Sequence, residues 1–264
     1  NNLPAEAIRH ALAARDFESA AGLIEKTYPA MDTSFQYAVW LGWVRKLPDE
    51  IVRARPVLSV DYARALSDSG EYEASKSWLQ EAEQRLEGSA EGMVVADEAQ
   101  FRTLPAMIAL AHSYHTQVQG DIEGTVKYAE LALELSPEED HYLHIHAMAT
   151  VTLGMAYWSR GDLDGAQRAL SVWINYCQKV GNIIFALASG GYLAEIIVAQ
   201  GRLREAERTY KQSIQLASTH DQVRHVTANL YLGLGLLYHE QGDQRSAAQH
   251  LRKCGELGEQ ALID

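Results

Sequence analysis

The sequence predicts an all-α protein, a right-handed superhelix (solenoid) of antiparallel helix hairpins. One turn motif, a glycine followed by a polar residue, recurs at Gly120, Gly161, Gly201 and Gly242, at spacings of 41, 40 and 41 residues. Apolar residues with helical spacing flank these turns, so we expect about a dozen helices of ~12–18 residues and no sheet. One hairpin cannot bury its apolar side alone, so stacked hairpins share a core and leave a concave and a convex face.

The turn at Gly161 shows how one hairpin is formed. Apolar helical stretches occupy residues 153–160 and 166–173, on either side of it. Glycine ends the first helix because it takes the left-handed backbone conformation without a Cβ clash. Asp162 then caps the second helix by accepting a hydrogen bond from a backbone N–H group. Two helices joined by so short a turn must pack antiparallel.

Small residues stand at matched heights on the two helices of each hairpin, where they let the backbones approach closely. Seven residues before the four glycines are Ser113, Gly154, Ala194 and Gly235, and five residues after them are Thr125, Ala166, Ala206 and Ala247. Four residues before the glycines are Thr116, Tyr157, Ile197 and Tyr238, which we expect beside the close contact.

Two further copies of the turn lie nearer the N-terminus. Gly70 stands 50 residues before Gly120, and the surplus falls in residues 88–92, a small and polar stretch that predicts a loop. Arg15 stands where a degraded copy of the motif should have its glycine.

Prolines punctuate the predicted helices. Pro48 and Pro56 bracket a short helix, because proline fits a first turn but disrupts an interior. Pro137 ends the helix through Leu135, and Pro105 predicts a kink or a late start in the helix from about 95 to 119.

Composition narrows the classes of function. The formal net charge of −12 disfavours binding to a phosphate backbone. The sequence has no run of eighteen apolar residues, so we expect no membrane span. Only Cys177 and Cys254 occur, so neither a disulfide framework nor a cysteine metal site is indicated. The start at Asn1 has neither an initiator Met nor a leader pattern, so we expect a piece of a longer cytoplasmic chain.

The sequence gives little support to catalysis or to metal binding, so we expect no enzyme, no cofactor and no metal. Ser189-Gly190-Gly191 is not a nucleophile elbow, and neither cysteine has an evident histidine partner. Two groups of histidines have spacings that could share a helix face, and zinc is the alternative to packing or solvated roles for them. They are His112 with His115, and His141 with His144 and His146.

The pattern Gly-x-Leu-x-x-Ala, with a small residue seven positions before the glycine, resembles the tetratricopeptide repeat over residues 57–257. The period of about 40, against the usual 34, is similar to the variant in MalT-like regulators. In the first quarter, segments 6–16, 40–43, 47–50 and 53–56 resemble the lead-in to the sensor region of large ATP-binding LuxR-type transcription regulators. We therefore expect one repeat domain over 1–264, with lead-in helix pairs at 1–56 and repeats at 57–264.

This resemblance implies a cytoplasmic activator of the STAND class, with an ATP-binding module before this segment and a helix-turn-helix domain after it. Neither motif lies within the sequence. The segment would be the sensor, which in this family binds an inducer, such as an oligosaccharide, or a regulatory protein, and thereby favours a self-associating active state. We expect no direct contact of this segment with nucleic acid or membrane.

The resemblance also places a ligand. The concave face should receive the residues 13, 10, 6, 3 and 2 positions before each glycine. The candidate ligand-binding residues are Arg64, Tyr114, Gln117, Met155, Trp158, Glu195, Asn229 and His239. Aromatic rings with carboxylate and amide neighbours suit a sugar or a peptide.

Simpler roles are open for several of these positions. Trp158 and Tyr114 can pack against the next hairpin, and Met155 can fill core space. Gly190 and Gly191 each cost about 1 kcal/mol inside a helix, which either a close helix or room for a ligand would offset. Two functions remain in view, a ligand sensor and a plain interaction scaffold that holds a peptide or helix in its groove.

Overall fold

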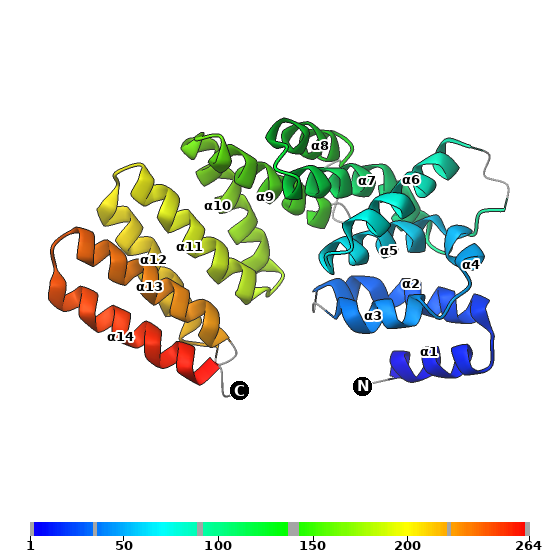
Figure 1. Cartoon of the computed structure of the whole chain (residues 1–264), viewed down its shortest axis with the longest axis horizontal. Helices are drawn as coiled ribbons and strands as arrows, with labels where there is room; N and C mark the ends of the chain where they lie inside the picture. The colour runs from blue at the N-terminus through cyan, green and yellow to red at the C-terminus, as the bar shows by residue number, and fades with distance from the viewer. Residues whose placement is uncertain (1–2, 34–35, 89–91, 137–142, 221–222, 262–264) are drawn as a thin grey trace. The chain divides into compact units, whose positions relative to one another are not determined.

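The computed structural model describes residues 3–33, 36–88, 92–136, 143–220 and 223–261, and within these ranges it is all-α. Fourteen helices follow one another there, and consecutive helices pack as antiparallel hairpins (Figure 1). The described part of the chain contains no helix long and apolar enough to cross a membrane. The helices form two compact units, unit 1 at residues 1–146 and unit 2 at residues 147–264.

Unit 1 contains the lead-in helices and the first two glycine hairpins. Its helices are α1 (Leu3–Ala13), α2 (Phe17–Thr33), α3 (Tyr37–Val44), α4 (Asp49–Arg53), α5 (Pro56–Asp68), α6 (Tyr72–Glu87), α7 (Glu98–Val118) and α8 (Ile122–Glu134). Trp40 is fully buried at the centre of its core, beside Ile24 and Leu58. The indole N–H of Trp40 donates to the carbonyl of Ile24 at 3.0 Å, so burial of this large ring leaves no polar atom unsatisfied.

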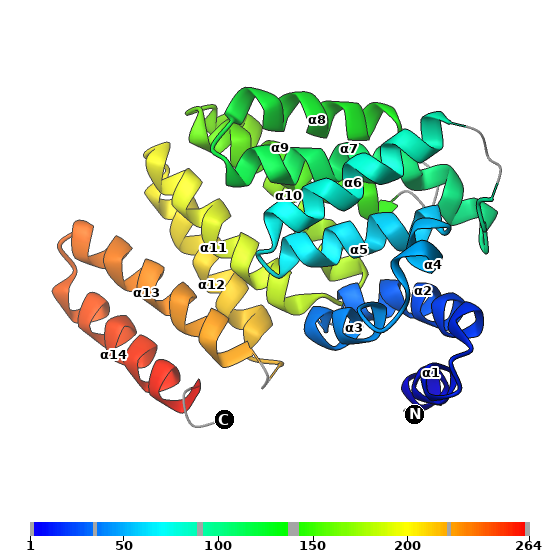
Figure 2. The same ribbon diagram turned by 45° about the vertical axis from the view of Figure 1, so that its right-hand side comes forward.

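Unit 2 takes most of α9 (Leu143–Ser159) and all later helices. These are α10 (Leu163–Lys179), α11 (Ile183–Ala199), α12 (Leu203–Ala217), α13 (Arg224–Glu240) and α14 (Gln244–Ala261). Figures 1 and 2 show α11 to α14 lying side by side in chain order. Leu187, Ile197, Leu230 and Leu234 form the buried centre between these helices.

The predicted turns are confirmed. The glycines at 70, 120, 161, 201 and 242 all have φ between +75° and +84°. The Asp162 carboxylate accepts from the backbone N–H of Gly165 at 2.9 Å, as expected for a helix cap. Arg15 has φ +57°, so the arginine in the degraded copy does hold the left-handed conformation of a glycine. Gly181, which the period of about 40 residues passes over, ends α10 in the same way with φ +77°.

The glycines at two of the predicted small positions do mark close helix approaches. A Cβ added at Gly154 would lie 2.9 Å from the Cβ of Ala169, and one at Gly235 would lie 2.9 Å from Leu251 Cγ. Side chains larger than hydrogen would therefore push these helices apart.

The prolines fall mostly as predicted. Pro48 is the N-cap of the short helix α4, and Pro56 is the first residue of α5. Pro105 is tolerated inside α7, which already begins at Glu98 behind an Asp97 cap, so a late helix start was wrong. Gly88 ends α6 where the loop was expected, whereas Pro137 lies outside the described residues.

Candidate functional site

A cavity of about 300 Å³ opens in unit 2 between α11 and α13, with one side chain from α12 on its wall. It is lined by Leu187, Ala188, Gly191, Tyr192 and Glu195 of α11, Tyr210 of α12, and Val226, Asn229, Leu230, Leu232, Gly233 and Leu236 of α13. We call this cavity the α11–α13 pocket.

The repeat register accounts for half of this lining. Residues spaced by three and four positions lie on one face of a helix. The positions 13, 10 and 6 before Gly201 and Gly242 therefore face the same way on the two helices. All six residues at these positions line the pocket: Ala188, Gly191, Glu195, Asn229, Leu232 and Leu236. The positions 3 and 2 before each glycine are absent from the pocket lining.

Two glycines shape the pocket. A Cβ at Gly233 would lie 2.5 Å from the hydroxyl oxygen of Tyr210, so the missing side chain on α13 creates the space that this ring occupies. At Gly191 the nearest atom to an added Cβ is Leu230 Cδ2, at 3.4 Å. Its neighbour Gly190 is buried, and a Cβ there would clash with Ser213 of α12. Helix approach thus explains Gly190, whereas Gly191 leaves space in the pocket.

Glu195, Asn229 and the buried phenol of Tyr210 are polar side chains in a mostly apolar lining. Burial raises the pKa of Glu195, and burial together with the Glu195 charge raises the pKa of Tyr210 to about 12. The side chains of Glu195 and Asn229 make no hydrogen bond or ion pair with another described residue. The pocket therefore offers a carboxylate, an amide and a phenol to a ligand with matching hydroxyl or amide groups.

The rim of the pocket is apolar and exposed. Tyr192, Leu232 and Leu236 are 44%, 40% and 51% exposed. Exposed side chains of this kind, gathered at one opening, are typical of a surface that another molecule covers. The ring of Tyr192 also meets the ring of Trp158 on α9, with centroids 5.8 Å apart, so the aromatic surface continues past the pocket.

Of the other three predicted residues in unit 2, Trp158 contacts the rim of the pocket. Trp158 is half-buried and packs against the cluster of Ala166, Leu170 and Ile196, so it does pack against the next hairpin. Met155 is half-buried one turn before it. His239 is exposed near the end of α13, where its Nδ1 lies 3.3 Å from Gln244 Oε1, and it does not line the pocket.

In unit 1, Arg64 occupies a crowded ionic cluster. Its guanidinium lies 3.5 Å from an Asp32 carboxylate oxygen and 5.6 Å from the centroid of the Tyr28 ring. Burial alone would raise the pKa of Asp32, but Arg64 and His144 outweigh it and lower that pKa to about 2. Asp61, also close to Arg64, is buried, and burial raises its pKa well above its usual range.

The remaining two predicted residues lie on α7. Tyr114 and Gln117 are both half-buried. Burial raises the pKa of Tyr114, and the nearby Asp68 carboxylate adds to this effect. Arg64 therefore lies among charged groups, Tyr114 and Gln117 are half-buried, and none of the three lines the α11–α13 pocket.

Two histidines of α7 and one of the cysteines have packing roles. His112 bonds to Glu83 at 2.8 Å and stacks on Tyr128, and the buried His115 lies 2.9 Å from Ser75 Oγ. His141 lies outside the described residues. Burial raises the pKa of Cys177 to about 12, which keeps this thiol protonated. Within the described ranges, no three His, Cys, Asp or Glu side chains converge as metal ligands would.

Comparison with known proteins decides the family. Residues 106–264, more than half of the chain, match the family model described as the MalT-like TPR region. The chain belongs to the MalT-like TPR family. It is also 25% identical, over 213 residues, to the HTH-type transcriptional regulator MalT of Serratia proteamaculans (strain 568). That alignment covers 81% of this chain and 23% of the regulator, so the chain spans about a quarter of the length of this relative.

Solved structures agree on the fold of this MalT-like TPR chain. BtubC (BKLC) from P. vanneervenii superposes with a TM-score of 0.62 over 97% of this chain and 92% of its own, at 13% identity. The APC/C hetero-tetramer Cut9-Hcn1 gives a TM-score of 0.68 over 97% of this chain and 43% of the other, at 12% identity. At these identities the likeness concerns the fold alone.

Proposed function

We propose that this chain is the non-enzymatic sensor domain of a cytoplasmic transcription regulator, and that the α11–α13 pocket binds its inducer. The observation that carries the proposal is the convergence of six register positions from two adjacent repeats on one pocket. The pocket combines unpaired polar groups with an exposed apolar rim, which is the usual composition of a small-molecule site. Family membership supports the regulatory role.

The favoured inducer is a neutral polyhydroxylated molecule such as an oligosaccharide. Its hydroxyl groups would donate to Glu195 and bond to Asn229, while its C–H faces would pack on Leu232, Leu236 and the ring of Tyr192. A volume of about 300 Å³ holds one part of such a ligand, and the remainder would extend over Tyr192 toward Trp158. Binding would favour the self-associating state of the full-length protein if that state binds the ligand more tightly.

The test is a thermal-shift and calorimetry screen of this chain with malto-oligosaccharides and other oligosaccharides. A ligand at a hundred times its Kd should stabilise the fold by about 2.7 kcal/mol. Glu195→Gln and Asn229→Ala should each weaken binding about tenfold, because each removes one hydrogen-bonding partner. Glu240→Gln is the matched control, since this exposed carboxylate on α13 lies outside the pocket. Equal loss in the control, or full affinity in both pocket variants, would reject the pocket.

One observation favours a second candidate, a peptide or helix in the same groove. Leu232 and Leu236 are exposed and one helical turn apart, a spacing that suits the apolar stripe of an amphipathic helix. In that case no oligosaccharide would shift the melting temperature. Leu232→Ser with Leu236→Ser would then abolish capture of the regulatory partner, while Glu195→Gln would have little effect.

A further inference from the structure

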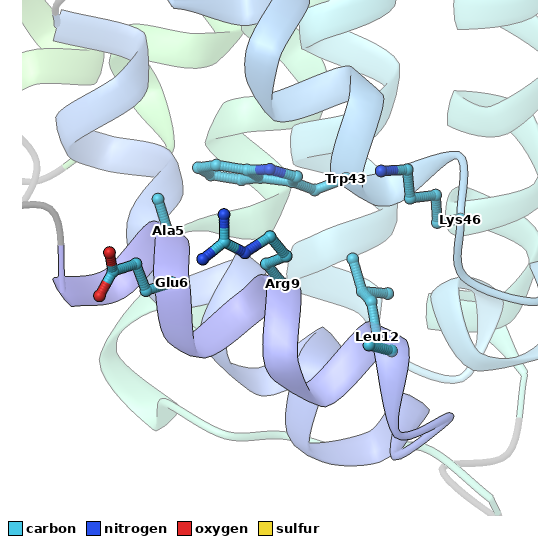
Figure 3. Close-up of a pocket in the computed structure, with 7 residues that line it drawn as sticks. Ala5, Glu6, Arg9, Leu12, Trp43 and Lys46 are labelled. Carbon is cyan, nitrogen blue, oxygen red and sulfur yellow. The ribbon is translucent and has the colours of Figure 1, made fainter.

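A second cavity lies at the other end of the chain, in unit 1. It has a volume of about 510 Å³ and opens between α1 and the end of α3 (Figure 3). Its walls are Ala5, Glu6, Arg9, Leu12 and Ala13 from α1, with Trp43 from α3 and Lys46 just after it. We call it the α1–α3 pocket.

The cations of the α1–α3 pocket are unpaired, unlike their neighbours along the chain. Arg45 lies 2.6 Å from a Glu71 oxygen, and Arg53 pairs with Asp49 at 3.5 Å. Neither the guanidinium of Arg9 nor the amino group of Lys46 forms an ion pair or hydrogen bond with another described residue. Two exposed cations therefore line one cavity, and their N–H groups are available to a ligand.

Figure 3 shows how the charges lie around the ring of Trp43. The guanidinium of Arg9 extends below the indole, and the amino group of Lys46 points toward the same side chain. The Glu6 carboxylate lies at the edge, beyond Arg9 as seen from Lys46. With two cations and one anion the pocket is locally positive, in a chain whose formal net charge is −12.

Trp43 provides a fixed flat surface. Its ring is half-buried and packs on the core of unit 1, which holds it in place, while it also bounds the cavity. Leu12 and Ala13 add apolar surface on the α1 side. A planar ring could lie on this indole at a stacking distance, with an anionic group held between the two cations.

We propose that the α1–α3 pocket binds a small anion that carries a planar ring, in addition to the inducer in unit 2. The ring packs on Trp43, and a carboxylate or phosphate group bonds to Arg9 and Lys46. Polymeric nucleic acid is disfavoured by the overall negative charge of the chain. An aromatic carboxylate and a nucleoside monophosphate share the required chemistry.

Two pairs of probes separate these sources in calorimetric titrations of the whole chain. Indole-3-acetate is compared with neutral indole-3-acetamide, and adenosine monophosphate with adenosine. At least one anion should bind, about tenfold or more tighter than its neutral partner, and its affinity should fall as salt is added. Binding of indole-3-acetate alone identifies a carboxylate site, and binding of adenosine monophosphate alone identifies a phosphate site.

Variants then place the site. Arg9→Gln and Lys46→Gln should each lower the affinity for the anion about tenfold and leave the affinity for the neutral partner unchanged. Lys26→Gln is the matched control, because this exposed lysine on α2 lies outside the pocket. Trp43→Leu should lower the affinity for both the anion and its neutral partner, because both carry the planar ring. If that variant fails to fold, the two charge variants still decide. Absence of binding by both anions, or unchanged affinity in Arg9→Gln and Lys46→Gln, overturns the proposal.

Discussion

The hydroxyl of Tyr210 on α12 occupies space that a side chain at Gly233 on α13 would need. A Cβ built at residue 233 would lie 2.5 Å from the hydroxyl oxygen and 2.6 Å from two ring carbons. The Tyr210 ring is 3% exposed, so it has little freedom to move aside. One missing methyl group therefore sets how closely two helices of the α11–α13 pocket approach each other.

We expect Gly233→Ala to destabilise the fold by about 1–3 kcal/mol, the usual cost of overpacking a well-filled core. The new methyl group would displace Tyr210 and widen the spacing of α12 and α13. Urea unfolding followed by far-UV circular dichroism measures the change. Stability equal to wild type would show that Tyr210 has an alternative position.

Gly191→Ala, in the same pocket, should have the opposite effect on stability. Its added Cβ meets Leu230 Cδ2 at 3.4 Å, and replacing a helical glycine by alanine stabilises by about 0.5–1 kcal/mol. The methyl group should still reduce the volume of the pocket, and calorimetry should show a lower affinity for the inducer. If Gly191→Ala strengthens the fold and leaves inducer affinity unchanged, the ligand lies elsewhere.

Arg15→Gly should stabilise unit 1. Among the described residues other than glycine, Arg15 alone has positive φ, and this conformation costs an L-residue roughly 1–2 kcal/mol. The greater freedom of glycine in the unfolded chain offsets part of the gain, so we expect about 0.5–1 kcal/mol from thermal unfolding. Arg15→Ala retains the Cβ and is the control; an equal gain from alanine would mean that side-chain charge causes the effect.

The ionic cluster around Arg64 predicts opposite pH effects for two aspartates. Burial raises the pKa of Asp61 in the folded state. The stabilisation linked to its proton is complete below the unfolded pKa and is lost as pH rises through the folded pKa. Asp61→Asn should therefore be more stable than wild type at pH 8, and this advantage should shrink toward pH 4.

Asp32→Asn is the matched comparison on the same guanidinium. The folded pKa of Asp32 is lowered to about 2, so its contribution is present above the unfolded pKa and lost as pH falls through the folded one. The variant should lose about 2 kcal/mol at pH 7, with a smaller loss near pH 3. Parallel pH profiles for both variants, from urea unfolding, would contradict this assignment.

The glycine register made the fold and part of the pocket predictable from the sequence. Turns, hairpins and close approaches depend on local residue types, so the roles of Gly161 and Asp162 in the turn can be predicted from the sequence alone. Gly181 was readable too, because Gly181-Asn182-Ile183 repeats the motif 20 residues after Gly161 and 20 before Gly201. The longer period passes over it, because it lies half-way between two glycines of that register.

The other lining residues could not be predicted from the glycine register. The register does not show how deeply a side chain is buried or which side chains of other helices meet it. Tyr210 comes from the second helix of its hairpin and reaches the pocket only because residue 233 is glycine. The surroundings of Arg64 include Asp32, which lies on α2, before the first glycine repeat. Spacing along a helix gives the direction of a side chain, but it does not show which distant residue will meet it.

The positions that hold the hairpins together and the positions that face the pocket are different members of the same helices. On α13, for example, Gly235 is kept small by Leu251 of the neighbouring helix, whereas Asn229 and Leu236 line the pocket. If the α11–α13 pocket binds an inducer as proposed, point mutations at a few sites in two neighbouring repeats would give a new effector specificity while the architecture is inherited unchanged. In that case recognition can evolve separately from folding.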